Sequence, residues 1–149
     1  MPHVRPPEEF DAADRSLFLA GGITGTRDWQ AELVALLADL PLTLLNPRRE
    51  NYPWDDPSAA EAQISWEFRH LRRATAVAFW FPPETLCPIA LFELGGQVRA
   101  AGQPLFVGTD PAYGRRRDVD IQLRLARPEV TVVDSVAELA AQVRAWAGA

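Results

Sequence analysis

Five short runs that are almost entirely apolar, separated by longer segments of mixed polarity, constrain the fold of this 149-residue chain more than any other feature. The runs lie at residues 17–20, 42–45, 75–81, 104–108 and 130–133. Continuous apolar runs are typical of strands that are buried on both faces of a sheet. Because amphipathic segments separate them, we predict a three-layer α/β sandwich with a five-stranded parallel sheet. The strand order expected for such a flavodoxin-like domain is 2-1-3-4-5.

The segments between the runs carry the signals of helices. Apolar residues recur at helical spacing across residues 29–40. A capping box, Ser-x-x-Glu, predicts the start of a second helix at residues 58–61, and the same pattern recurs at residues 135–138. Pro88 suits the first position of a third helix, and residues 120–127 suit a further short one.

Composition argues against several classes of protein. Apolar residues make up 48% and charged residues 23% of the chain, which is ordinary for a soluble globular domain and argues against intrinsic disorder. The net charge of −5 and the lack of a long basic run argue against a nucleic-acid polymer as partner. No apolar run approaches the roughly 18 residues of a membrane span, so no membrane partner is expected. The single cysteine, Cys87, excludes an internal disulfide framework.

The amino-terminal segment contains prolines and acids rather than the apolar core of a secretory signal. We therefore expect residues 1–14 to be a flexible arm, residues 15–149 to form the α/β domain, and the protein to be cytoplasmic. The two histidines, His3 and His70, lie far apart in the chain and predict no metal site. His70 lies on the polar flank of its helix, and we expect it to be solvated.

In an open parallel sheet, ligands bind at the carboxyl ends of the strands, beside the point where the strand order reverses. Loops 21–26 and 82–88 are expected there. Glycines in the first loop let backbone N–H groups approach an anion at the start of a helix, although a tight strand-to-helix turn would also explain them. This loop lacks the P-loop lysine and the full dinucleotide pattern, which argues against a kinase or a dinucleotide dehydrogenase. Its candidate binding residues are Gly21, Gly22, Ile23, Thr24 and Gly25.

Glu93 is the most informative residue. It lies on the flank of an apolar stripe in a helix that is apolar nearly all round, so its carboxylate is expected to be half buried. Burial raises the pKa of a carboxyl, whereas the N–H groups at the start of the helix would lower it and keep Glu93 ionised. A partly buried lone glutamate is usually either paired in a structural contact or functional, and the spacing leaves both interpretations open.

Glu67 is the second candidate acid. It borders the apolar stripe Ile64, Phe68 and Leu71, which we expect to be the inner face of its helix. A salt bridge to one of the arginines on the same helix would explain its position equally well. The spacing alone does not decide whether Glu67 reaches the site.

Several other side chains near the expected site have two interpretations. Cys87 lies just before the third helix, where its pKa would be lowered, but no histidine lies near it in the sequence to act as its base. Asn46 and the pair Arg48-Arg49 follow the second strand and would read a base edge or hold a phosphate, or form a solvated loop. The three arginines at residues 115–117 likewise suit either a phosphate site or a solvated loop.

Three segments carry a family resemblance: residues 18–23 (FLAGGI), the pair Trp66-Glu67 and, above all, residues 90–95 (ALFELG). Through them the chain resembles the nucleoside 2-deoxyribosyltransferase family, in particular its nucleoside 2-deoxyribosyltransferase-like branch. The resemblance extends over roughly residues 16–108. Relatives include deoxynucleoside-monophosphate N-glycosidases, which hydrolyse rather than transfer.

The resemblance implies a flavodoxin-like fold and cleavage or transfer at the N-glycosidic bond of a small nucleoside or nucleotide. It implies that Glu93 is the nucleophile, which attacks C1′ of the sugar with retention and forms a glycosyl ester. It implies that Glu67 contacts the base, and we expect Glu67 to protonate the leaving base as general acid. The glycine loop would line the sugar or phosphate pocket, and no metal or organic cofactor is expected.

Two positions depart from the family pattern. Transferases usually carry Asp where this chain has Cys87, and many members place a Tyr hydroxyl where it has Phe18. We count both positions, with Asn46, among the candidate substrate contacts. The departures favour, as an alternative, a nucleoside- or nucleotide-binding module without turnover. An acidic nucleophile on this scaffold would also suit a hydrolase of another ribosyl substrate, such as NAD.

The third helix is apolar on both faces, and a sheet covers only one of them. We therefore expect a homodimer or a higher homo-oligomer that uses the stripe Leu91, Leu94 and Val98. Members of the family that the chain resembles also form oligomers.

Overall fold

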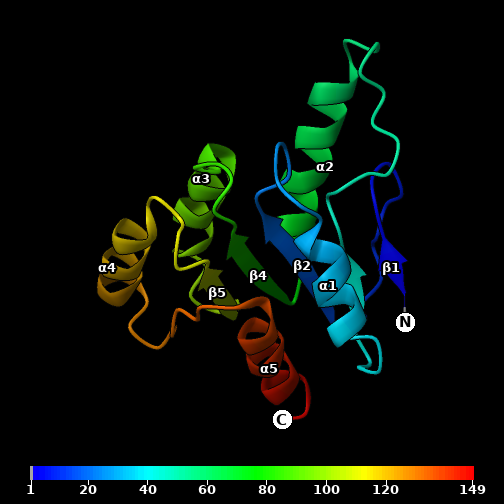
Figure 1. Cartoon of the computed structure of the whole chain (residues 1–149). Coiled ribbons are helices and arrows are strands. Elements are labelled where there is room, and N and C mark those ends of the chain that lie inside the picture. The colour runs from blue at the N-terminus through cyan, green and yellow to red at the C-terminus, as the bar shows by residue number, and fades with distance from the viewer. Residues whose placement is uncertain (1) are drawn as a thin grey trace.

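Residues 2–149, which the computed structural model describes, form a parallel five-stranded sheet with helices on both faces (Figure 1). The strands are β1 (His3–Val4), β2 (Ser16–Gly21), β3 (Thr43–Leu45), β4 (Ala76–Phe81) and β5 (Leu105–Thr109). The helices are α1 (Trp29–Leu36), α2 (Ala59–Arg73), α3 (Pro88–Gln97), α4 (Arg116–Ala126) and α5 (Val136–Ala147). The flavodoxin-like α/β fold predicted from the apolar runs is confirmed.

The strand order, β1-β3-β2-β4-β5, differs from the predicted order at both edges of the sheet. Four of the predicted strands are present as β2 to β5, in the predicted relative order. The fifth run, residues 130–133, forms only an isolated parallel bridge between Val133 and Gly108, because only its last residue reaches the ladder beside β5. The fifth strand is instead β1 from the arm, where His3 pairs beside β3 at the opposite edge.

Successive side chains of a strand point to opposite faces of the sheet, and both faces are covered here. Leu17, Leu19 and Trp80 pack with α1 and α5 on one face. Phe18 and Phe79 pack with α2, α3 and α4 on the other. This burial on two sides explains why the strands are continuous apolar runs in the sequence.

The ends of the helices follow the predicted signals at some positions only. Pro88 is the first residue of α3, as predicted. The Ser135 hydroxyl accepts a hydrogen bond from the N–H of Glu138 (3.1 Å), so the capping box of α5 is confirmed. α2 begins at Ala59, as the pattern at residues 58–61 predicts, but the capping box itself is absent because the Ser58 hydroxyl donates to Asp56 (2.7 Å).

Much of the α2 face that we predicted to be internal is exposed to solvent. Ile64 and Phe68 are 63% and 56% exposed, whereas Leu71 from the same stripe is buried. Trp66 and His70 are buried in their place, with their rings stacked at a centroid distance of 4.0 Å. The predicted inner face is therefore wrong, because the large indole of Trp66 gains more by burial than the side chains of the expected stripe.

α3 also presents a different apolar side from the one predicted for oligomer contacts. Leu94 is buried, and Leu91 and Val98 pack against the core of the same chain. Ile89 and Phe92 are instead 64% and 83% exposed. The predicted stripe is thus covered within the chain, and the free apolar side of α3 is the one that faces the same groove as α2.

The described part of the arm lies against α2. Phe10 is buried, and its N–H donates to Nε2 of His70 (3.0 Å). Nδ1 of His70 lies 2.7 Å from the carbonyl oxygen of Trp66. The prediction that His70 is solvated is wrong, because the arm covers it, and burial lowers the pKa of its imidazole.

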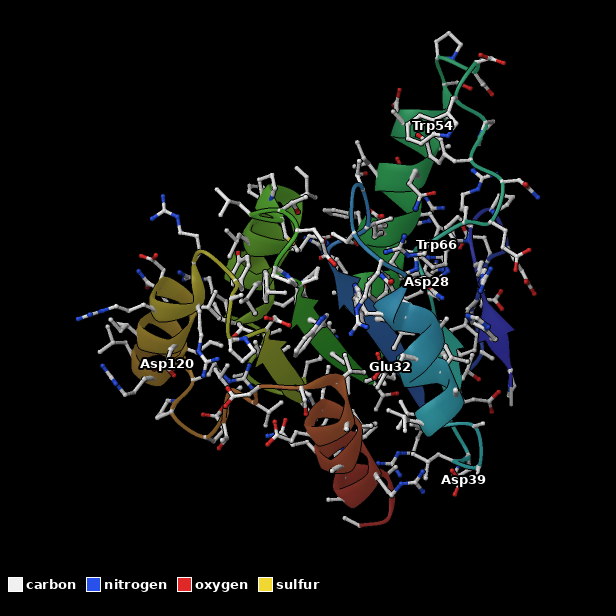
Figure 2. All side chains as sticks on the ribbon, viewed as in Figure 1. Asp28, Glu32, Asp39, Trp54, Trp66 and Asp120 are labelled. Carbon is white, nitrogen blue, oxygen red and sulfur yellow. The ribbon has the colours of Figure 1, made fainter. Side chains whose placement is uncertain are left out.

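The first turns of α2 project beyond the sheet (Figure 1). Trp54, in the preceding loop, lies near this projecting end and is 79% exposed (Figure 2). Neither α2 nor any other helix within residues 2–149 is long and apolar enough to cross a membrane.

Candidate active site

A cavity of about 290 Å³ lies at the carboxyl ends of β2 and β4, where the sequence predicts a site. The loop after β2, the helix α2 and the start of α3 form its walls. The lining residues are Gly21, Gly22, Ile23, Thr24, Ile64, Glu67, Thr85, Cys87, Pro88, Ile89, Ala90 and Glu93. They include two carboxyl groups and no cationic side chain, so the cavity is acidic.

Glu67 and Glu93 reach the same cavity from two helices. Burial, and then the nearby carboxyl of Glu67, raise the pKa of Glu93 to about 8. Burial also raises the pKa of Glu67, and a hydrogen bond from Nε2 of Gln63 (3.1 Å) opposes that rise. The expectation that helix N–H groups keep Glu93 ionised is wrong, because Glu93 lies beyond the first turn of α3, where their influence fades.

Neither of these acids forms a salt bridge with the arginines on α2, which have other partners. Arg69 and Arg73 both pair with Glu9 of the arm. Arg72 lies over the ring of Phe68, 3.4 Å from its centroid. A structural ion pair on α2 therefore does not explain the acid in the cavity wall.

Two glycines of the loop after β2 are required by close approach. Gly21 has a φ of 142°, and a Cβ there would lie 2.1 Å from the carbonyl oxygen of Trp80. A Cβ at Gly22 would lie 2.7 Å from Sγ of Cys87. Gly25, with a φ of 74°, belongs to the same loop but is not among the lining residues. Glycine thus allows the loop to lie directly against β4 and the start of α3.

The same loop offers backbone donors beside the cavity. Within residues 2–149, the N–H groups of Ile23, Thr24 and Gly25 donate to no protein acceptor. The carbonyl oxygen of Gly22, in contrast, accepts a hydrogen bond from Nε1 of Trp29 (2.8 Å). Free N–H groups in a glycine-containing turn suit the oxygen atoms of a sugar or a phosphate.

Cys87 lines the cavity just before α3, with a left-handed φ of 50°. Its backbone N–H donates to the hydroxyl of Thr85 (3.2 Å). The side chain is 5% exposed, and burial raises the pKa of its thiol, so the predicted lowering is wrong. Cys87 therefore presents a neutral thiol to the cavity.

Two predicted substrate contacts do not line the cavity. Phe18 is 1% exposed, with its ring centroid 5.9 Å from that of Trp66 beneath α2. Asn46 is fully buried, its Oδ1 accepts from the N–H of Arg48 (3.0 Å), and its Nδ2 lies 3.1 Å from Nε2 of His3. Phe18 thus packs β2 against α2, and Asn46 joins the end of β3 to β1 and to Arg48.

The arginine run at residues 115–117, a candidate phosphate site, forms ion pairs within the protein. In the arginine run, Arg115 lies 3.4 Å from Asp118 and Arg116 lies 2.5 Å from Asp134. In the part of the chain that the structure describes, no group of three or more histidine, cysteine, aspartate or glutamate side chains is arranged to hold a metal ion.

Sequence analysis missed two contacts that hold the walls of the cavity. The hydroxyl of Tyr113 donates to the carbonyl oxygen of Leu86 (2.7 Å), and burial raises the pKa of Tyr113 to about 12. Arg48 donates to the glycine loop, with its Nη2 2.9 Å from the hydroxyl of Thr26. Each contact joins segments more than 20 residues apart, so no local pattern could reveal it.

Comparison with known proteins identifies a family for this chain. A family model described as nucleoside 2-deoxyribosyltransferase like matches residues 14–113, which include every residue that lines the cavity. No curated protein matches the chain. The family predicted from the three sequence segments is confirmed.

Proposed function

The chain belongs to the nucleoside 2-deoxyribosyltransferase-like family, and we propose that it cleaves or transfers at the N-glycosidic bond of a (deoxy)nucleoside or nucleotide. Membership of the family supports nucleoside glycosyl transfer or cleavage in general. The observation that carries the finer proposal is the pair of desolvated carboxyls, Glu67 and Glu93, in one cavity. Retaining glycosyl chemistry requires two carboxyl groups close together, one ionised as the nucleophile and one protonated as the acid.

In the first step, an oxygen of Glu93 attacks C1′ of the sugar while the bond from C1′ to the base nitrogen breaks. The proton on Glu67 passes to the departing base, which leaves poorly as an anion. In the second step, water or another base attacks C1′, the ester to Glu93 breaks, and Glu67 takes the proton of the incoming group. The sugar therefore leaves with its original configuration at C1′.

This mechanism needs the single proton of the pair on Glu67. In the free protein burial and the nearby Glu67 raise the pKa of Glu93 to about 8, while the donor on Gln63 favours the charged form of Glu67. The positive charge that develops at C1′ in the transition state stabilises the carboxylate of Glu93, and this favours the productive placement of the proton. The reactive form is thus reached by moving one proton within the pair.

A second candidate function is a binding module without turnover. The neutral thiol of Cys87 and the apolar, buried ring of Phe18 favour it, because neither supplies the polar group that is usual at those positions in the family. In that case the cavity would hold a nucleoside and release it unchanged.

Chromatography of the products tests the proposal. The protein is incubated with deoxynucleosides, ribonucleosides and their monophosphates, and free base is measured. We expect release by the wild type and none by Glu93→Gln, with Glu84→Gln as the matched control because Glu84 is exposed and outside the cavity lining. Binding by the wild type without release of base supports the binding module, and release by Glu93→Gln contradicts the assignment of the nucleophile.

We also propose that a second copy of the chain covers the apolar face shared by α2 and α3. A groove of about 720 Å³ lies there, with exposed Ile64, Phe68, Ile89 and Phe92 on its walls, and it shares both glutamates with the active-site cavity. Exposed apolar patches of this kind mark interaction sites. A two-fold pairing would place the same patch on both copies and exclude water from the glutamates.

A further inference from the structure

Arg48 follows β3 and reaches the glycine loop that precedes α1. Its Nη2 donates to the hydroxyl of Thr26 (2.9 Å) and to the carbonyl oxygen of Arg27 (3.0 Å), with Gly22 O at 3.5 Å. Its Nε donates to Oε1 of Gln30 (2.9 Å). The side chain is 18% exposed and is not among the residues that line the cavity. The guanidinium is therefore committed to the loop and is not free to bind a ligand.

The contact between Arg48 and Gln30 is not explained by stability alone. Gln30 is fully buried, and in the described part of the chain its Nε2 has no hydrogen-bond partner. A buried donor without a partner destabilises a fold, so an apolar side chain would suit the space better if stability were the only requirement. The orphaned amide makes sense if its other end, Oε1, is needed to hold Arg48 in place.

Arg48 uses hydrogen-bond acceptors of the loop and leaves its backbone donors unused. The carbonyl oxygens of Gly22 and Arg27 accept from the guanidinium, whereas the N–H groups of Ile23 and Thr24, two residues of the cavity lining, donate to no acceptor within residues 2–149. An arginine holds several acceptors at once because its donors form a rigid planar fork. Residues of the cavity lining therefore carry backbone donors that the protein itself leaves unused.

We propose that Arg48 is a positioning residue, which fixes the glycine loop so that its free N–H groups meet the sugar part of the ligand. The inference rests on the proposed function, because that function gives the loop its ligand. Arg48 acts through the loop and does not touch the ligand. Its loss should therefore weaken binding of the substrate more than it slows the chemical step at Glu93.

The first test separates KM from kcat in Arg48→Ala. We expect KM to rise between about 10- and 100-fold, the effect of a small misplacement of a binding group, with a smaller change in kcat. Added guanidinium ion should lower KM again, whereas sodium chloride at the same ionic strength should not. The matched control is Arg49→Ala, which removes a neighbouring arginine that lies over the ring of Tyr52, away from the loop.

A second variant covers the case in which Arg48→Ala fails to fold. Arg48→Lys keeps the charge but has one compact donor group in place of the fork, so it should also raise KM while its melting temperature stays near that of the wild type. A KM equal to that of the wild type in the folded Arg48 variants, or an equal rise of KM in Arg49→Ala, would overturn the proposal.

Hydrogen exchange tests the same inference without turnover. In the free protein, the peptide that spans residues 22–28 should exchange faster in Arg48→Ala or Arg48→Lys than in the wild type, and peptides of α5 should not change. If the wild type releases no base and this difference is present, the proposed function fails and the role of Arg48 in fixing the loop stands. Equal exchange of the loop in both proteins refutes the role of Arg48, whatever the activity.

Discussion

Replacing Glu93 by glutamine should stabilise the folded protein, and increasingly so as the pH rises. The pKa of Glu93 is about 8 in the folded chain, against 4.5 for an ordinary glutamate. Between these two pH values the folded protein holds a proton that the unfolded chain has lost, so its stability falls as the pH increases. Glutamine has nearly the same shape but stays neutral, and it removes this dependence.

The magnitude follows from the rise in pKa, which is about 3.5 units from 4.5 to about 8. Each unit corresponds to about 1.4 kcal/mol, so the upper bound is about 5 kcal/mol above pH 8. Solvent at the mouth of the cavity reduces this figure, and we expect about 2 kcal/mol. For a domain of this size that corresponds to a rise of roughly 4–8 °C in melting temperature.

The assay is urea unfolding of the wild type, Glu93→Gln and the control Glu84→Gln at about pH 5.5, 7 and 8.5. Glu93→Gln should differ little from the wild type at the lowest pH and be the more stable protein at the highest, while Glu84→Gln follows the wild type throughout. A difference between Glu93→Gln and wild type that does not vary with pH would refute the reasoning. So would a lower stability of Glu93→Gln at every pH, the result expected for a structural glutamate.

Three further predictions concern the walls of the cavity. Glu67→Gln should slow base release by about 10²- to 10⁴-fold, most for poor leaving bases, and an unchanged rate contradicts the role of general acid. The same variant should lower the pKa of Glu93 in the pH profile of kcat/KM, because it removes a nearby acid. Gly22→Ala should cost about 1–3 kcal/mol in urea unfolding, because its Cβ would lie 2.7 Å from Sγ of Cys87; an unchanged midpoint would show that the loop moves aside freely. Tyr113→Phe should cost about 1 kcal/mol in the same assay, since it removes one hydrogen bond to the loop before α3.

Oligomeric state is measured by light scattering on the wild type and on Phe92→Glu. We expect the wild type to be a dimer or larger and the variant to be a monomer, because a charge at the centre of an apolar interface is left desolvated and unpaired. The matched control is Leu125→Glu. Leu125 is 75% exposed on α4, so this charge should leave the assembly intact. A monomeric wild type at micromolar concentration would contradict the proposal.

The sequence predicted the parts of the fold that depend on local patterns. Continuous apolar runs identify β2 to β5, since burial on both faces leaves no polar alternation. Pro88 identifies the start of α3 because its ring suits only the first turn of a helix. The two-residue strand β1 has no such pattern, and residues 130–133 have the pattern but make only a bridge.

The orientation of α2 could not be predicted in the same way. Periodicity gives the angle between apolar residues around a helix, and α2 has apolar residues on two sides. Which side meets the sheet depends on how Trp66 fits against Phe18, a contact between distant segments. The burial of His70 depends likewise on Phe10 of the arm, 60 residues earlier in the chain.

The structural alternative for Glu93, a buried charge held by a partner, lacks such a partner within residues 2–149. A buried carboxylate is stabilised by a nearby cation or by hydrogen-bond donors, and its pKa then falls. The pKa of Glu93 rises instead, and the strongest charge acting on it is that of another acid, Glu67. Two acids that destabilise each other in one cavity lower the stability of the fold at neutral pH, as the orphaned amide of Gln30 does beside the glycine loop. Stability therefore does not account for these residues, whereas a reaction that needs a carboxylate and a carboxylic acid side by side accounts for the pair.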